Sequence, residues 1–263
     1  MSNASTACRK LTLIITVLLG LSIGAQASNI TYFTLPGAED NAGENVNAIA
    51  TFTTGPNFIM IRLTNQQANP VSVGQNLSDL IFTVSGTLTG ATIGSSSAPA
   101  ITVDDNGTFT SAGTVTPGWA LSSTSDTITL DLLASAEAPK HTIIGPPAPS
   151  NEYMAANSSI ANTGGPHNPF IDQTAMWTIN APGVTSGTTI DAVTFSFGTT
   201  HGDNNPGTTS HMGATPEISS LLLMGTGVLG LAGVLRRKLR RHPLEECEDK
   251  SQLELKECSC EAK

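Results

Sequence analysis

The sequence predicts an all-β protein: an antiparallel β-sandwich of jelly-roll or Ig-like type, with an N-terminal signal peptide and one C-terminal transmembrane helix. Short apolar runs alternate with polar residues, as where Val193, Phe195 and Phe197 share one face of an extended stretch. Turn-forming residues separate these runs, and no helical periodicity is sustained before residue 215. Many short strands with regular turns favour a sandwich.

Seven segments carry this strand pattern. They are residues 30–35, 46–53, 58–63, 80–85, 127–133, 175–179 and 190–197. Residues 136–169 interrupt the pattern and are rich in Pro, Gly and Asn, so we expect a long surface loop or insertion there. Residues 201–214 have the composition of a spacer, which places the sandwich domain at residues 28–200.

The first 27 residues have the three parts of a secretory signal peptide. Arg9 and Lys10 close a positively charged region, and a short apolar stretch follows them. Ala25 and Ala27 then form an A-x-A motif, which predicts cleavage by signal peptidase before Ser28. The alternative is an uncleaved anchor, which the shortness of the apolar stretch disfavours.

A second apolar segment lies near the other end of the chain. Residues 218–235 carry no charge, and eighteen helical residues span about 27 Å, close to the roughly 30 Å of a membrane's hydrocarbon core. We therefore expect a single transmembrane helix here, because a helix satisfies its own backbone groups in lipid. Five cations follow the segment: Arg236, Arg237, Lys238, Arg240 and Arg241. The positive-inside rule keeps them in the cytoplasm and exports everything before residue 215.

Three residues, Thr215, Pro216 and Glu217, directly precede this span. A Pro-Glu pair, a Leu/Gly-rich span and an Arg-rich end, in that order, resemble the PEP-CTERM sorting signal of Gram-negative bacteria, here residues 215–241. The resemblance implies recognition by an exosortase, passage through the inner membrane, and release to the cell surface or extracellular matrix. The chain departs from the family at Ile218, which replaces a second proline and predicts slower cleavage. It also continues beyond the basic cluster to Lys263.

The continuation, residues 242–263, is an acidic cytoplasmic tail that contains three of the four cysteines, Cys247, Cys258 and Cys260. Structural zinc sites favour two to four residues between paired cysteines, so Cys258-x-Cys260 indicates reduced thiols. The fourth cysteine, Cys8, lies in the signal peptide. No disulfide is therefore expected in the exported domain.

Acidic residues dominate the exported part of the chain. Between residues 28 and 214, Arg62 and Lys140 stand against thirteen acids, a formal charge of −11, whereas the whole chain has −9. Such a surface repels phosphate backbones, so nucleic acid is excluded as a partner.

The sequence contains no catalytic motif, and we expect no enzymatic activity, cofactor or metal. Neither G-x-S-x-G nor H-E-x-x-H occurs. The glycines 225, 227 and 230 spell G-x-G-x-x-G, but they lie inside the apolar span rather than between a strand and a helix. Thirteen acids also make chance pairs of carboxylates common, so such a pair would not by itself indicate a glycosidase.

Residues of the types that bind metals are scattered along the sequence. His141 and His167 fall in the expected long loop, and His201, Asp203 and His211 fall in or near the spacer, where solvated side chains are the simplest interpretation. Residues 104–107, Asp-Asp-Asn-Gly, lack the spacing of a calcium loop and indicate an Asx turn.

These features predict an exported, non-enzymatic cell-surface or extracellular-matrix protein, associated with biofilm or exopolysaccharide and sorted by a C-terminal exosortase signal. Its processing enzymes would be signal peptidase and exosortase, with exopolysaccharide as a further candidate partner. The alternatives are a carbohydrate-binding or carbohydrate-cleaving sandwich, or a permanently anchored single-pass membrane protein. An aromatic ledge would favour the carbohydrate alternative, but Trp119, Trp177, Tyr32 and Tyr153 are too few and too scattered to predict one.

Overall fold

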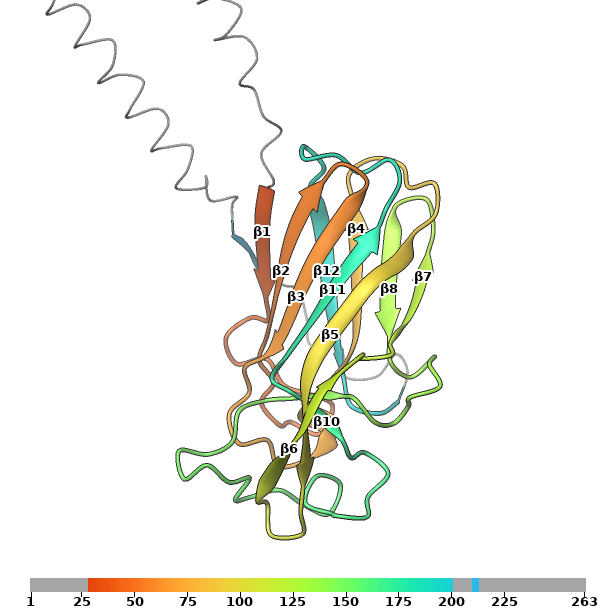
Figure 1. Cartoon of the computed structure of the whole chain (residues 1–263). Helices are drawn as coiled ribbons and strands as arrows, with labels where there is room; N and C mark the ends of the chain where they lie inside the picture. The colour runs from red at the N-terminus through yellow and green to blue at the C-terminus, as the bar shows by residue number, and fades with distance from the viewer. Residues whose placement is uncertain (1–27, 201–209, 213–263) are drawn as a thin grey trace, which may run out of the picture. The chain divides into compact units, whose positions relative to one another are not determined.

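The computed structural model describes residues 28–200 and 210–212, and this part of the chain is built from strands, as predicted (Figure 1). The predicted signal peptide, most of the spacer, the sorting signal with its transmembrane span, the basic cluster and the tail lie outside the described residues. Within the described ranges, the structure contains no helix with the length and apolarity to cross a membrane.

Thirteen strands and one short 3-10 turn, η1 (Val73–Gln75), make up this part of the chain. The strands are β1 (Ser28–Phe33), β2 (Ala48–Gly55), β3 (Phe58–Asn65), β4 (Leu77–Val84), β5 (Thr92–Val103), β6 (Phe109–Val115), β7 (Ala120–Ser123), β8 (Thr127–Asp131), β9 (Ile143–Ile144), β10 (Phe170–Asp172), β11 (Thr174–Asn180), β12 (Ile190–Phe197) and β13 (Ser210–Met212). Each of the seven predicted strands is present, with ends that differ by up to three residues.

Hydrogen bonding joins all of these strands into one open, mixed sheet. Its order is β13-β1-β2-β3-β11-β5-β10-β9-β4-β8-β7, with β12 paired to β4 and β6 paired to β5. The expectation of a wholly antiparallel arrangement is wrong at one place, since β9 and β10 run parallel. The long strand β5 joins the two halves of the sheet: its first part pairs with β11 and its second part with β10 and β6.

The main core lies between the two halves of this sheet. Figure 1 shows β2, β3, β11 and β5 in front of β12, β4, β8 and β7. Phe52 of β2 meets Phe82 of β4 with ring centroids 4.9 Å apart, and Trp119 meets Trp177 of β11 at 5.2 Å. These aromatic contacts hold the two halves together, because rings bury large apolar areas and add their own pairwise attraction.

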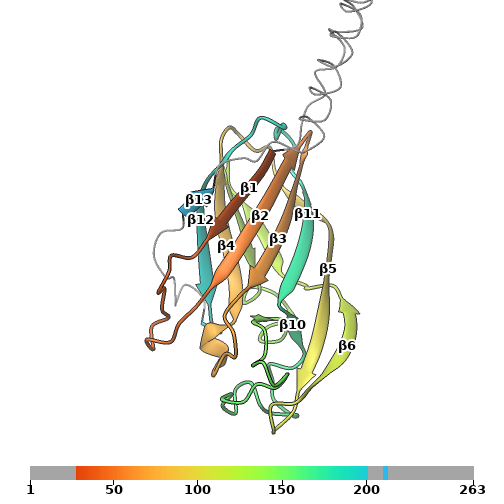
Figure 2. The same ribbon diagram turned by 90° about the vertical axis from the view of Figure 1, so that its left-hand side faces the viewer.

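A second, smaller core includes residues of the segment 136–169, where the sequence predicts a long surface loop or insertion. The segment has little regular structure, yet Tyr153 and Ile160 are fully buried in it and pack with Ile101, Val103 and Phe170. The Tyr153 hydroxyl donates a hydrogen bond to the Gly145 carbonyl at 3.0 Å. Figure 2 shows irregular chain gathered around β10, at the end of β5 and β6. The segment closes this end of the sheet, and its composition hid that role because its buried residues follow no regular period.

Candidate functional site

One half of the sheet has one face toward the core and one face away from it. This half consists of β1, β2, β3, β11 and the first part of β5. Along β3 the side chains alternate, so that Ile61 and Leu63 are buried whereas Met60 and Arg62 are exposed. We call the side that points away from the core the outer face. Continuous strand pairing from β1 through β2, β3 and β11 to β5 makes it one sheet surface.

Strand register arranges the side chains of the outer face in three rows. The first row is Thr31, Thr51, Arg62, Met176 and Ser97; the second is Asn29, Thr53, Met60, Thr178 and Ser95; the third is Phe33, Ile49, Thr64 and Thr174. None of the three rows contains an acidic residue. The outer face is therefore rich in hydroxyl groups and has Arg62 as its one charged member.

Hydroxyl groups on the outer face form hydrogen bonds across the strands, two with another hydroxyl group and one with an amide oxygen. The pairs are Thr31 with Thr51 at 3.3 Å, Thr64 with Thr174 at 2.9 Å, and Thr53 donating to Asn29 Oδ1 at 2.5 Å. A hydroxyl group has one donor and two acceptor positions, so each pair still has hydrogen-bonding capacity for a ligand.

Arg62 lies in a hollow of about 480 Å³ on the outer face. The side chains of Thr53, Ser95 and Ser97 line the hollow, together with Met60 and Met176, which are 44% and 52% exposed. Among the described residues, no acidic group or hydrogen-bond acceptor engages the Arg62 side chain. A guanidinium group without a protein partner is available to an anion.

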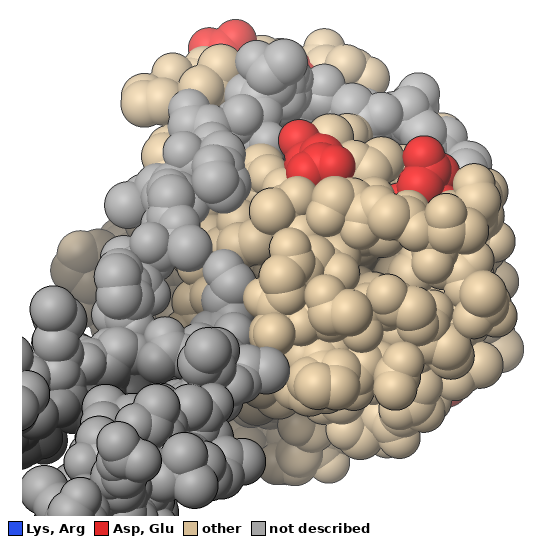
Figure 3. All heavy atoms as spheres, turned by 90° about the horizontal axis from the view of Figure 1, so that it is seen from above, with Lys and Arg blue, Asp and Glu red and all other residues tan. Residues whose placement is uncertain are grey.

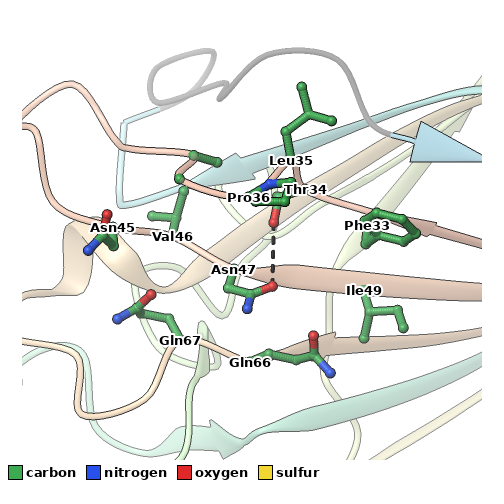
Figure 4. A pocket seen from close by; sticks show the side chains of 12 residues that line it. Phe33, Thr34, Leu35, Pro36, Asn45, Val46, Asn47, Ile49, Gln66 and Gln67 are labelled. Carbon is green, nitrogen blue, oxygen red and sulfur yellow. Dashed lines mark hydrogen bonds between the residues drawn. The ribbon is translucent and has the colours of Figure 1, made fainter.

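A second hollow of about 590 Å³ adjoins the third row, where β1 ends and β2 begins (Figure 4). Four amide side chains line it, those of Asn45, Asn47, Gln66 and Gln67, beside Phe33 and Leu35. The Thr34 hydroxyl is 3.5 Å from Asn47 Oδ1. Strands rise about 3.3 Å per residue, so the six steps from Asn47 to Thr53 extend about 20 Å along the outer face.

The aromatic residues considered in the sequence do not form a ledge. Trp119, Trp177, Tyr32 and Tyr153 are all buried, at most 4% exposed. Trp119 Nε1 donates to the His141 carbonyl at 3.0 Å, and the Tyr32 hydroxyl donates to the Ile190 carbonyl. All four stabilise the interior, so none offers a stacking surface to a sugar ring.

One pair of carboxyl groups does form, between Asp79 of β4 and Asp131 of β8. Both are buried, and burial, with the hydrogen bond and the negative charge of Asp131, raises the pKa of Asp79 to about 8. Asp131 Oδ1 accepts backbone N–H bonds from Leu133 at 2.7 Å and Ala134 at 3.1 Å, which favours its ionised form. Asp79 therefore holds the proton. The two groups bond directly to each other, leaving no room for the glycosidic bond that a glycosidase pair must flank.

His141 and His167 lie in the packed part of the domain, His211 lies in β13, and His201 lies outside the described residues. His141 is buried rather than solvated, and its Nδ1 donates to the Pro117 carbonyl at 3.0 Å. His167 is half-buried, and burial lowers its pKa. Asp104 Oδ1 accepts N–H bonds from Asn106 and Thr108, both at 2.9 Å, so the predicted Asx turn is confirmed. Across residues 28–200 and 210–212, no three His, Cys, Asp or Glu side chains gather in a metal-binding group.

Arg62 differs from most other charged residues of the domain, which are acidic. On the end of the molecule that Figure 3 shows, acidic side chains of described residues are visible, and no described Lys or Arg is visible there. Lys140, the other basic residue between 28 and 200, is exposed in the irregular segment after β8. Arg62 is therefore an exposed positive charge on a domain whose other charged residues are mostly acidic.

The predicted site residues lie mostly outside the described part of the chain. These are Ala25, Ala27, Thr215, Pro216, Glu217 and the five cations from Arg236 to Arg241, whereas Ser28 is the first residue of β1. Sequence reasoning missed the outer face. The sequence does contain a signal for this face. In Thr51-Phe52-Thr53 and Met60-Ile61-Arg62, the apolar residue in the middle points to the core, so the residues on either side of it point to the opposite face.

Comparison of the chain with family models, with curated proteins and with solved structures found no match.

Proposed function

We propose that the chain is an exported, non-enzymatic protein of the cell surface or extracellular matrix, sorted by a C-terminal exosortase signal. The observation that carries this proposal is the order of Pro216-Glu217, an uncharged span and five cations in residues 215–241. The cations stop translocation and hold the Pro-Glu pair at the outer boundary of the membrane. Glu217 fixes the depth of this site because its charge is costly to bury in lipid.

In this proposal the signal peptide directs export, and signal peptidase cleaves after Ala27. The protein then remains anchored in the inner membrane until exosortase releases it. An acidic, cysteine-free exported domain supports the proposal, since it needs no disulfide to fold and stays soluble outside the cell.

We also propose that the described sheet is a β-sandwich of jelly-roll or Ig-like type. Contacts between Phe52 and Phe82, and between Trp119 and Trp177, support this proposal because they join the two halves of the sheet across a shared core. In a sandwich, the inward faces of two sheets pack in this way.

A tag after Lys263 tests the sorting proposal in a host that has an exosortase. The tag should separate from the exported domain, and Glu217→Ala should keep the two joined. Ile218→Pro should speed the separation by restoring the Pro-Glu-Pro motif. A tag that stays on the full-length protein, with no effect of Glu217→Ala, would instead identify a permanently anchored membrane protein.

A second candidate function, carbohydrate binding by the exported domain, is favoured by the outer face. Its hydroxyl rows and free guanidinium are groups that hydrogen-bond to sugars, although the domain offers no ledge from its buried Trp and Tyr residues.

A further inference from the structure

We propose that the outer face binds a saccharide that carries a carboxylate, with Arg62 as the residue that holds this carboxylate. The proposal extends the proposed function, which supplies the extracellular setting. The described residues alone would form the binding site, and the test of the proposal requires no exosortase.

The charge of the ligand follows from Arg62. The guanidinium is exposed, has no partner among the described residues, and lies between Thr51 and Met176 in its row. A guanidinium group presents a planar set of donors that matches both oxygens of a carboxylate. The remaining charge of the domain repels densely charged polymers, so the ligand carries isolated carboxylates rather than one on every unit.

The class of the ligand follows from the position of Arg62 in the sheet. Strand β3 pairs on both sides, with β2 and β11, and β11 pairs with β3 and β5. An acidic peptide therefore cannot add to these strands through its backbone, which is the usual way that a sheet binds an extended peptide. A single arginine also differs from the basic clusters that recognise phosphorylated peptides.

The neighbours of Arg62 suit sugars better. Ser95 and Ser97 offer hydroxyl groups that both donate and accept, as sugar hydroxyls do, and the Thr53 hydroxyl, which donates to Asn29, can still accept. The exposed thioethers of Met60 and Met176 provide adaptable apolar contacts for the C–H faces of a ring. The hollow of about 480 Å³ falls within the range of about 300–1,000 Å³ of small-molecule sites.

The amide-lined hollow extends the same surface. Phe33 and Ile49 line this second hollow and belong to the third row, which lies two residues along β2 from the row of Thr51 and Arg62, so the two hollows occupy neighbouring rows of the outer face. Asn47 and Gln66 add amide donors and acceptors beyond the third row (Figure 4). The combined surface fits a short oligosaccharide with its acidic unit at Arg62.

The test is a titration of the full-length chain, held in phosphatidylcholine nanodiscs, with cellobiouronic acid and with its neutral parent cellobiose. Binding is followed by calorimetry and by ligand-observed NMR. We expect the acidic disaccharide to bind more tightly than cellobiose. Arg62→Gln should weaken that binding by at least about tenfold, because it removes charge-assisted hydrogen bonds. Arg62→Lys should weaken it less, since the charge remains but the two-pronged geometry is lost.

Lys140→Gln is the matched control, because it removes the same charge from the described part of the chain without touching the outer face. It should leave binding unchanged. The proposal is overturned if Arg62→Gln binds like the unmodified chain, if Lys140→Gln weakens binding equally, or if cellobiose binds as tightly as the acid. Tighter binding of a tetraglutamate peptide would identify an acidic-peptide site instead and would equally overturn the proposal. Failure of the unmodified chain to bind the acidic disaccharide would also overturn this proposal but would leave the sorting proposal intact, and failure of tag release would leave this one intact.

Discussion

At the scale of single residues, the pair Asp79 and Asp131 links stability to pH. The pKa of Asp79 rises from 3.8 to about 8 on folding, because the carboxyl group is buried next to a second carboxylate. Between these two values the folded state binds more protons than the unfolded state. The contribution of Asp79 to stability is therefore greatest below pH 3.8 and falls as the pH rises toward 8.

Replacing Asp79 with Asn should remove this dependence. Asn has the shape of the protonated acid, and its Nδ2 can donate to Asp131 without losing a proton. Thermal unfolding of Asp79→Asn should show a higher Tm than the unmodified chain at pH 8, and a flatter dependence of Tm on pH between 5 and 8. Glu152→Gln, which neutralises an exposed acid, should keep the original slope. Equal slopes for Asp79→Asn and the unmodified chain would show that the pair does not share a proton.

At the scale of elements, the turn between β5 and β6 fastens the segment 136–169. Gly107 has a positive φ of 81°, and its carbonyl accepts the Tyr153 N–H at 2.9 Å. A Cβ atom added at Gly107 would lie 2.5 Å from the Tyr153 carbonyl oxygen. The glycine is thus required both for its backbone conformation and for the close approach of a distant segment.

We expect Gly107→Ala to destabilise the domain by about 2 kcal/mol or more, from backbone strain together with the clash against Tyr153. Gly113→Ala is the matched control. Gly113 also has a positive φ, 84°, but an added Cβ would meet nothing within 4 Å, so only the strain of about 1 kcal/mol should appear. Urea unfolding followed by tryptophan fluorescence compares the two variants. Equal losses would mean that the contact with Tyr153 contributes nothing.

The individual strands also show how much of this fold the sequence predicts. Strands such as β2, β3 and β12 were predicted because their buried residues alternate. Strands β5 and β6 were missed because they are rich in Ser, Thr and Gly, and much of their surface is exposed. Their pairing depends on neighbours far along the chain, which local composition does not record.

The candidate site, like the fold, is only partly predictable from the sequence. Alternation identifies Arg62 and Met176 as outward positions on their own strands. Their adjacency, however, depends on the pairing of β3 with β11, which lie more than one hundred residues apart in the chain. A single sequence without the fold gives no signal for that pairing. The outer face was therefore predictable strand by strand but not as a surface.

At the scale of the whole molecule, residues 28–214 should fold without the segments that flank them. Residues 28–214 contain no cysteine, and the two cores of the described part draw on residues between 30 and 197. Expressed alone, this stretch should be soluble and β-rich by circular dichroism, with a Tm that does not respond to reductant. The Tm should also be unchanged by Ca²⁺, because Asp104 is already bonded within its turn. A clear rise with Ca²⁺, or a helical spectrum, would contradict these expectations.

The most direct test of the sorting proposal is the intact mass of the protein recovered from the surface or medium of an exosortase-bearing host. We predict a species that begins at Ser28 and ends close to Glu217, without the apolar span, the five cations or the cysteine tail. Ala27→Leu should prevent formation of that N-terminus, because signal peptidase accepts only a small residue before the cleaved bond. A mass that includes every residue from Ser28 to Lys263 would contradict the proposal and show that residues 215–241 act only as an anchor.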